Sequence, residues 1–257
     1  MSTPAVDRSE LQAKVQAMYR DVALNPQGEF HFEMGRALAE RLGYRAADLD
    51  RIPAEAIDSF AGVGYYFHLL DEMQGARVLD LGSGSGMDTF LASLIVGPEG
   101  SVVGLDMTDA QRAKAETLRQ RHGVRNVTYV KGFIDAPPFE DGSFDVVISN
   151  GVLNLMVDKP AAFREAARVL RSGGQLAIAD IVTAVDLPES ISCNTTLWAA
   201  CIGGAWQLER YRQAIEAAGL RIVAEQVNDQ YRFLSANAQG ATKKFGVKSI
   251  SLRADKV

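Results

Sequence analysis

The stretch Arg77-Val-Leu-Asp-Leu-Gly-Ser-Gly-Ser-Gly-Met-Asp88 decides the fold of this chain. The apolar residues of 78–81 suit a strand that is covered on both faces. Three glycines follow at alternate positions: Gly82, Gly84 and Gly86. Glycine permits positive φ and removes the β-carbon, so the backbone can close around a ligand. We expect a helix to begin near Met87 with its free N–H groups toward that ligand, and this series predicts a nucleotide-binding crevice.

Two details of this stretch select the nucleotide. The dinucleotide fingerprint is G-x-G-x-x-G, whereas this turn is G-x-G-x-G and ends at Gly86. The strand also carries Asp80, whose anion would repel a pyrophosphate in a poorly solvated site but would attract a sulfonium or an amine. S-adenosylmethionine carries both cations and no phosphate, so we predict it as the cofactor, with Ser83 and the glycines around it. The alternatives are NAD and a glycine turn without a ligand.

Length, composition and charge are those of one large domain, or of one domain with a small cap. The chain has 257 residues, of which 47% are hydrophobic and 23% are charged. Its net charge of −5 argues against nucleic acid as the main partner. No apolar stretch is long enough to span a bilayer, residues 1–10 lack the order of a signal peptide, and two cysteines form no disulfide framework. We therefore expect a cytoplasmic protein with no membrane partner and no bound metal; the sequence does not indicate its oligomeric state.

Residues 1–70 are expected to form a helical lid and substrate region. Helical spacing predicts helices over 7–24 and 33–42 and a short one over 52–60. The glycine-spaced aromatic loop 59–68 then leads into the organising strand. The alternative is a helical layer that only packs on the sheet.

The second and third predicted strands add residues for the nucleoside. The second strand, 101–106, ends in Asp106, 20 residues after Gly86. An acid at that place accepts hydrogen bonds from both ribose hydroxyls; the alternative is a helix N-cap carboxylate. We expect Met107 on the adenine face. After the strand 127–130, a turn places three further residues near the adenine: Phe133 and Ile134 as walls, and Asp135 as an acceptor for the amino group.

Alternating strands and helices predict a doubly wound parallel sheet. A fourth strand, 144–149, exits at Asn150, which we expect to touch the methionine part of the cofactor or the substrate, because ligands bind beyond the carboxyl ends of such strands. An amphipathic helix over 160–171 and a fifth strand over 175–180 follow. Strands over 221–227 and 247–253 complete the sheet, the last of them antiparallel, and the polar segment 228–246 between them is typical of a long loop.

The chain is thus expected to divide into the lid, residues 1–70, and a cofactor-binding core, residues 71–257. A segment of this core near 186–206 is expected to cover the substrate. It contains Cys201 and Trp206, which we regard as substrate-contacting candidates.

These motifs together resemble the class I S-adenosylmethionine-dependent methyltransferases, and more narrowly the arsenite methyltransferase branch. The resemblance covers roughly 60–254. The matching pieces are the organising stretch, Gly-Leu-Asp-Met-Thr108, Ile-Ser-Asn-Gly-Val-Leu-Asn-Leu155, Asp158-Lys159, Asp180-Ile181-Val182 and Trp198-Ala-Ala-Cys-Ile-Gly-Gly-Ala205. The resemblance implies a Rossmann-like core with additions at both ends.

The same resemblance implies a ligand set that this chain lacks. In that branch three cysteine thiolates hold arsenic(III), a soft thiophilic centre. Two of those cysteine positions fall at Val63 and Gly151, and only Cys201 matches. Cys193 lies near Cys201 in sequence and is either a second ligand or a small buried hydrophobe.

The transfer itself is expected to be an in-line displacement on the sulfonium methyl by a small-molecule acceptor. If the nucleophile carries a proton, the candidate bases are His31 and His68, with Asn150 as a third catalytic candidate. Each histidine is alternatively a packing or surface residue. Tyr19, Tyr65 and Tyr66 are candidates for the substrate pocket, and ordinary core positions are the alternative.

Three other functions remain open from the sequence. Arsenite methylation through Cys201 is one. A non-catalytic module that only holds S-adenosylmethionine is the second, and the missing cysteines motivate it. An NAD-dependent oxidoreductase is the third, and Asp80 and the glycine spacing disfavour it.

Overall fold

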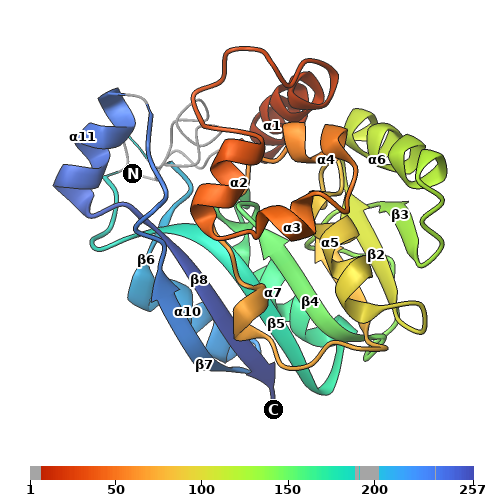
Figure 1. Ribbon diagram of the computed structural model, residues 1–257. Coiled ribbons are helices and arrows are strands. Elements are labelled where there is room, and N and C mark those ends of the chain that lie inside the picture. The colour runs from red at the N-terminus through yellow and green to blue at the C-terminus, as the bar shows by residue number, and fades with distance from the viewer. Residues whose placement is uncertain (1–6, 189–190, 192–202, 235) are drawn as a thin grey trace.

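One mixed sheet of eight strands forms the centre of the molecule (Figure 1). The computed structural model describes residues 7–188, 191, 203–234 and 236–257. The strands are β1 (Arg77–Leu81), β2 (Ser101–Asp106), β3 (Val127–Lys131), β4 (Phe144–Asn150), β5 (Leu170–Thr183), β6 (Trp206–Gln207), β7 (Leu220–Val227) and β8 (Lys248–Lys256). Seven of them follow the order β3-β2-β1-β4-β5-β8-β7, and β6 pairs with the end of β5.

The pairing confirms the predicted fold class. Strands β1 to β5 are parallel to one another, with Leu79 opposite Val103 on one side and Val147 on the other. Strand β8 runs antiparallel to both β5 and β7. The result is a doubly wound, mostly parallel sheet with an antiparallel strand near its C-terminal edge.

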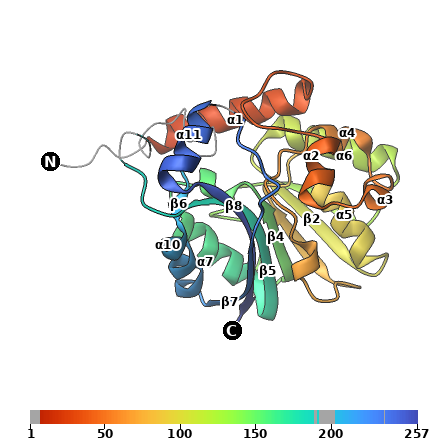
Figure 2. The ribbon, with the colours of Figure 1, turned by 60° about the vertical axis from the view of Figure 1, so that its left-hand side comes forward.

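Alternate residues of the central strands enter two separate cores. Val78 and Ile148 pack with the helices that precede β3, whereas Leu79 and Val147 pack with those that follow β4. Because side chains of a strand alternate between faces, a strand buried on both sides reads as a continuous apolar run. Figure 2 shows the two helical layers on opposite sides of the sheet.

Nine helices of three or more residues precede β5 in the described chain. They are α1 (Arg8–Leu24), α2 (Arg36–Leu42), α3 (Ala46–Leu49), α4 (Ala54–Asp58), η1 (Phe67–Leu69), α5 (Met87–Val96), α6 (Asp109–Arg121), η2 (Leu153–Leu155) and α7 (Lys159–Val169). After β6 come α10 (Leu208–Ala217) and, before β8, α11 (Ala236–Phe245). Helices α7 and α10 cover the face opposite to the N-terminal helices.

Helix α1 forms where its cap and its spacing place it. The Asp7 carboxylate accepts hydrogen bonds from the backbone N–H groups of Ser9 (2.8 Å) and Glu10 (3.0 Å), which satisfies donors that the helix leaves free. Leu11 and Val15 are buried on its inner face. In both views α1 lies across the top of the molecule, above the sheet (Figures 1 and 2).

Two parts of the chain differ most from the prediction. The segment 228–246 is not a continuous loop, because α11 occupies residues 236–245. Its composition is polar and its apolar spacing weak, so the pattern gave no signal. The helix predicted over 160–171 ends at Val169, and β5 begins at Leu170 and continues through Gly173, whose φ is +69°.

The proposed division at residue 70 stays a prediction. The N-terminal helices share a core with the sheet, and part of the segment 186–206 lies outside the described residues. Among the described residues, no helix is long and apolar enough to cross a membrane.

Candidate functional site

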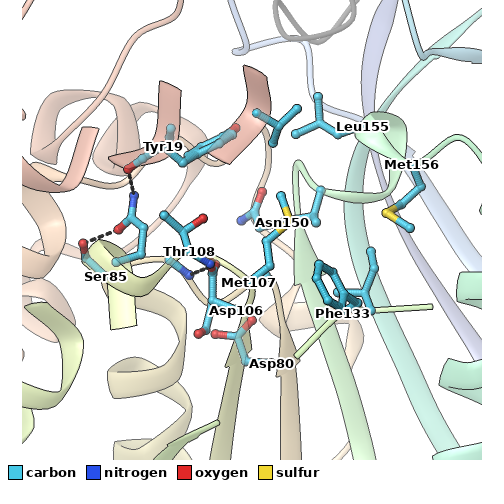
Figure 3. A pocket seen from close by; sticks show the side chains of 18 of the residues that line it. Tyr19, Asp80, Ser85, Asp106, Met107, Thr108, Phe133, Asn150, Leu155 and Met156 are labelled. Atoms are coloured by element: carbon cyan, nitrogen blue, oxygen red, sulfur yellow. Dashed lines mark hydrogen bonds between the residues drawn. The ribbon is translucent and has the colours of Figure 1, made fainter. Parts of the chain in front are cut away.

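A pocket lies at the carboxyl ends of β1, β2 and β4, with α1 above it (Figure 3). Between β1 and β4 the strand order changes direction, since β2 and β3 lie to one side and β5 to the other. In open α/β sheets, ligands bind at this topological switch point. The residues at the strand ends, Asp80, Asp106 and Asn150, all line the pocket.

The glycine turn needs glycine for space as well as for conformation. Gly82, Gly84 and Gly86 have φ values of +75°, +54° and +95°, a region that other residues rarely adopt. A β-carbon on Gly82 would lie 2.4 Å from Val152 Cγ2, and one on Gly86 would lie 2.2 Å from Tyr129 Oη. Gly82 and Gly84 line the pocket and Gly86 lies just behind it as the N-cap of α5.

Asp80 is a buried carboxyl group on the floor of the pocket. Its side chain is 2% exposed, and Thr89 Oγ1 donates a hydrogen bond of 2.6 Å to Asp80 Oδ2. Burial, and next the neighbouring Asp88, raise the pKa of Asp80 well above its ordinary value. A nearby cation would lower this pKa again, because it stabilises the ionised carboxylate.

Asp88, in the first turn of α5, is a second buried carboxylate in the same pocket. The hydroxyls of Tyr44 and Tyr66 donate to its two oxygens at 2.7 and 2.8 Å, and Asn150 Nδ2 donates to Oδ2 at 3.0 Å. Burial raises the pKa of Asp88, and these hydrogen bonds oppose that rise. Neither Tyr44 nor Asp88 was predicted; the only signal was an acid two residues after the last glycine of the turn.

Asn150 joins the pocket to the loop that precedes β1. Its Oδ1 accepts a hydrogen bond of 2.8 Å from the backbone N–H of Val63, and its Nδ2 donates to the carbonyl of Gly64 at 3.0 Å. A β-carbon on Gly62 would lie 2.8 Å from Asn150 Cγ. The amide therefore fixes how the loop 62–64 meets the pocket.

Asp106 has the geometry of a ribose acceptor. Its two oxygens accept hydrogen bonds from the backbone N–H groups of Gly84 (2.9 Å) and Thr108 (2.7 Å), which leaves further lone pairs for a ligand. Burial raises the pKa of Asp106. The N-cap of α6 is Thr108, so the structure does not support the N-cap alternative for Asp106.

The predicted adenine residues Met107, Phe133, Ile134 and Asp135 line one end of the pocket together. Figure 3 shows Met107 and Phe133 on neighbouring sides of the cavity. The Asp135 carboxylate also forms an ion pair with Arg8, at the start of α1. An adenine amino group would therefore share this carboxylate with the helix above.

A hydrogen-bond chain joins the glycine turn to α1. Ser85 Oγ donates to Gln111 Oε1, and Gln111 Nε2 donates to the carbonyl of Tyr19 at 2.8 Å (Figure 3). The predicted Tyr19 thus lines the pocket from above. Lys114 Nζ holds the end of the same helix through the carbonyl of Ala23 at 3.2 Å.

The other candidates do not line the pocket. His31 packs edge-on against Phe32, and His68 stacks on Tyr65 and contacts Gln226 Oε1 at 2.9 Å. The histidines and Tyr65 are thus placed for packing and surface contacts, which was the alternative for them. Tyr66 stands behind Asp88 without lining the cavity.

The remaining substrate candidates, Trp206 and Cys201, come from the C-terminal part of the chain. Trp206 packs under the guanidinium of Arg210, at 3.8 Å from the ring centre, and also does not line the pocket. Cys193 and Cys201 lie outside the described residues. Within the described part of the chain, no group of three His, Cys, Asp or Glu side chains is placed to hold a metal ion.

Known proteins of similar sequence identify the family of this chain. A family model described as a methyltransferase domain matches residues 72–219. The chain belongs to this methyltransferase family. The match confirms the family resemblance stated from the motifs and agrees with the predicted S-adenosylmethionine crevice.

Relatives lie in the arsenite methyltransferase branch. The chain is 37% identical to arsenite methyltransferase of Halobacterium salinarum over 72% of its length and 47% of the relative's. It is 40% identical to the Homo sapiens enzyme over 52% of its length and 38% of the relative's. The crystal structure of an arsenic(III) S-adenosylmethionine methyltransferase from Chlamydomonas reinhardtii is 30% identical, with a TM-score of 0.69, and the match covers 87% of this chain and 74% of that one. The chain spans less than half the length of those two curated relatives.

The pocket of this methyltransferase fits S-adenosylmethionine on its own residues. Ser83 lines the pocket, and its buried Oγ has no hydrogen-bond partner among the described residues. Asp80 and Asp88 are two buried carboxyl groups without a countercharge among the described residues, and Asp106 retains acceptor capacity. A polar group left without a partner in a native pocket calls for one from a ligand. A cationic amino acid nucleoside supplies both the positive charge and the hydroxyl donors.

Proposed function

We propose that this methyltransferase transfers a methyl group from S-adenosylmethionine to a small organic acceptor. The observation that carries the proposal is the juxtaposition of the buried carboxylates with an apolar half of the same pocket. Helix α1 contributes Leu11 and Val15 to that half, and the turn after β4 contributes Val152, Leu155, Met156 and Val157. Figure 3 shows Leu155 and Met156 across the cavity from Tyr19.

The apolar half indicates what the acceptor is like. Among the described residues lining the pocket, Arg8 is the one cationic side chain, and it is ion-paired with Asp135. An acidic acceptor would therefore lack a free cation in this part of the site, and burying an unpaired charge is costly. An uncharged, largely apolar molecule fits the walls.

The acceptor side also differs from a thiolate site. The resemblance to the arsenite branch sets two cysteines at positions 63 and 151. Here a β-carbon built on Gly151 would lie 3.3 Å from Val63 Cγ1, and Val63 is 1% exposed. The two positions are thus adjacent. In this chain one of them is an apolar valine, Val63, and the other is a glycine, Gly151. A soft metalloid has no thiolate pair to bind there.

The chain's own residues supply binding, orientation and exclusion of water. When bound, the cofactor supplies an electrophilic methyl group on a sulfonium. Asp106 and the glycine turn would hold the nucleoside, and Asn150 would fix the methionine end. Helix α1 would cover the acceptor, which strips water from the attacking atom and aligns it behind the methyl carbon. No histidine of the described residues lines the pocket to act as a base.

Calorimetry and product analysis test the proposal. Wild-type protein should bind S-adenosylmethionine, and Asp106→Asn should bind it about tenfold or more weakly, because a bidentate acceptor for the ribose becomes one amide oxygen. Incubation with cofactor and a panel of phenols, quinols and isoprenoids should give a product heavier by one methylene. Absence of binding at millimolar cofactor would refute the proposal, and binding without any product would favour a non-catalytic module.

Arsenite methylation is the second candidate, because the two curated relatives carry that name. The same panel therefore includes arsenite with a thiol reductant. If methylarsenicals form and Cys201→Ser abolishes them, the organic acceptor is wrong. Formation that is unchanged in Cys201→Ser would refute the thiolate argument as well. A cytoplasmic location, and the absence of a nucleic-acid partner, stay predictions from the sequence.

A further inference from the structure

Asp88 is a buried group to which the proposed function assigns no role separate from that of Asp80. It is 6% exposed and lines the pocket beside Asp80. Among the described residues, no Lys or Arg side chain forms an ion pair with either carboxylate. A buried carboxylate without a countercharge is expensive, and a second one beside it makes the cost larger.

Three neutral donors hold the Asp88 carboxylate in one orientation. Tyr44 binds Oδ1, while Tyr66 and Asn150 bind Oδ2. The tyrosines come from the N-terminal region and are 2% and 0% exposed, and Asn150 comes from the end of β4. Side chains from three separate parts of the chain thus converge on one anion and bring no positive charge to it. Such an arrangement orients an acceptor toward a cation that arrives from outside.

The neighbourhood contains a second sign of a missing ligand. Ser83 lines the same pocket, and its buried Oγ has no hydrogen-bond partner among the described residues. Asp80 already has one donor in Thr89 and stands nearest the start of the glycine turn. The two acids therefore occupy different parts of the pocket floor, one on β1 and one on α5.

We propose that Asp88 is a binding residue for the sulfonium end of the cofactor, with Tyr44 and Tyr66 as positioning residues that aim its carboxylate. The proposal rests on the proposed function, because it assumes that S-adenosylmethionine occupies this pocket. It adds a specific role: Asp88 distinguishes the charged cofactor from its demethylated product. S-adenosylhomocysteine has the same amino, carboxyl and ribose groups but a neutral sulfur, so only the charged form gains from Asp88. Such a residue favours release of the product after transfer.

The test compares two ligands on the intact chain by calorimetry. Wild-type protein, Asp88→Asn and Asp106→Asn are each titrated with S-adenosylmethionine and with S-adenosylhomocysteine. We expect Asp88→Asn to weaken binding of the cofactor about tenfold more than binding of the product, since a charge contact is removed from one ligand only. Asp106→Asn is the matched control and should weaken both ligands by the same factor, because both carry the ribose.

The outcomes separate this inference from the proposed function. Equal losses for the two ligands in Asp88→Asn would overturn the inference and leave the cofactor assignment intact. Failure of both ligands to bind wild-type protein would refute the proposed function itself.

A second measurement covers the case in which Asp88→Asn does not fold. The groups that face Asp88 are Tyr44, Tyr66, Asn150 and Asp80. Burial raises the pKa of Asp88, so the wild-type preference for the charged ligand should grow as pH rises and the carboxylate ionises. Tyr66→Phe removes a hydrogen bond that lowers this pKa, so the growth should shift to higher pH. A preference that does not change with pH, or a pH dependence that Tyr66→Phe leaves in place, would overturn the inference.

Discussion

At the scale of single residues, the glycine turn allows the energetic cost of a steric clash to be separated from the cost of backbone strain. Gly82 has a φ of +75°, and a β-carbon there would lie 2.4 Å from Val152, whereas Gly75 has a φ of +74° and nothing within 4 Å of the same point. Alanine at either site incurs the same backbone strain, of roughly 1 kcal/mol. Only Gly82→Ala adds a collision, which costs roughly a further 1–3 kcal/mol.

We therefore expect Gly82→Ala to lower the free energy of unfolding in urea by more than Gly75→Ala. The double variant Gly82→Ala, Val152→Ala should recover part of that excess, since it removes the colliding methyl groups. If the two single variants lose the same free energy of unfolding, the contact between Val152 and the turn does not contribute to the cost of Gly82→Ala.

Residues that end strands were predictable in the site, and residues that meet only in the folded chain were not. Asp80 and Asp106 follow apolar runs, and the carboxyl ends of parallel strands must share one edge of the sheet. Tyr44 and Asp88 are 44 positions apart, and no local pattern joins them. His31 and His68 were chosen for their chemistry and for their place in the aromatic N-terminal region, and neither of them lines the pocket.

At the scale of elements, the turn η2 lies next to two buried charged residues, Lys159 and Asp180. Lys159 Nζ donates to the carbonyls of Asn154 (3.1 Å) and Met156 (2.8 Å). Asp180 accepts a hydrogen bond of 2.6 Å from Tyr211 on α10. Burial lowers the pKa of Lys159 and raises that of Asp180 from 3.8 to about 6. The turn that forms the apolar wall of the pocket is therefore adjacent to two titratable groups, Lys159 and Asp180.

The raised pKa of Asp180 predicts how stability changes with pH. Between about pH 4 and 6 the folded chain holds a proton on Asp180 that the unfolded chain has lost, so the free energy of unfolding falls as pH rises. Asp180→Asn should show a weaker fall across this window, by roughly 1–3 kcal/mol. The measurement is urea unfolding at a series of pH values.

An exposed acid provides the control for this prediction. The Arg253 guanidinium lowers the pKa of Asp71, so the contribution of Asp71 to stability has the opposite sign and is lost as pH falls. Asp71→Asn should therefore leave the fall between about pH 4 and 6 in place. An identical slope in wild-type protein and Asp180→Asn would contradict the assignment of that fall to Asp180.

At the scale of the whole molecule, the strand order was only partly predictable. Five alternations of strand and helix fix a parallel sheet, and the organising stretch fixes where its ligand lies. The insertion of β8 between β5 and β7 depends on long-range pairing along eight residues, Gln175 to Val182 against Asp255 to Lys248. Hydrophobic periodicity carries no information about which strands become neighbours.

Ligand entry also depends on the arrangement of the whole molecule, because α1 lies over the pocket and the sheet forms the floor of that pocket. The helix is tied to the core through Arg8 and Asp135, through Gln111 and the carbonyl of Tyr19, and through Lys114. Each of these polar ties is a single contact, and Leu11 and Val15 add buried apolar packing on the inner face of the helix. The cofactor would add contacts beneath the helix, so its binding should stabilise α1 selectively.

Hydrogen exchange measures this effect directly. We expect S-adenosylhomocysteine to slow amide exchange in α1 far more than in α7, which covers the opposite face of the sheet and serves as the internal control. Arg8→Ala should speed exchange of α1 in the free protein, because it removes the tie to Asp135. If ligand binding slowed both helices equally, the change would be global stabilisation and α1 would not act as a lid.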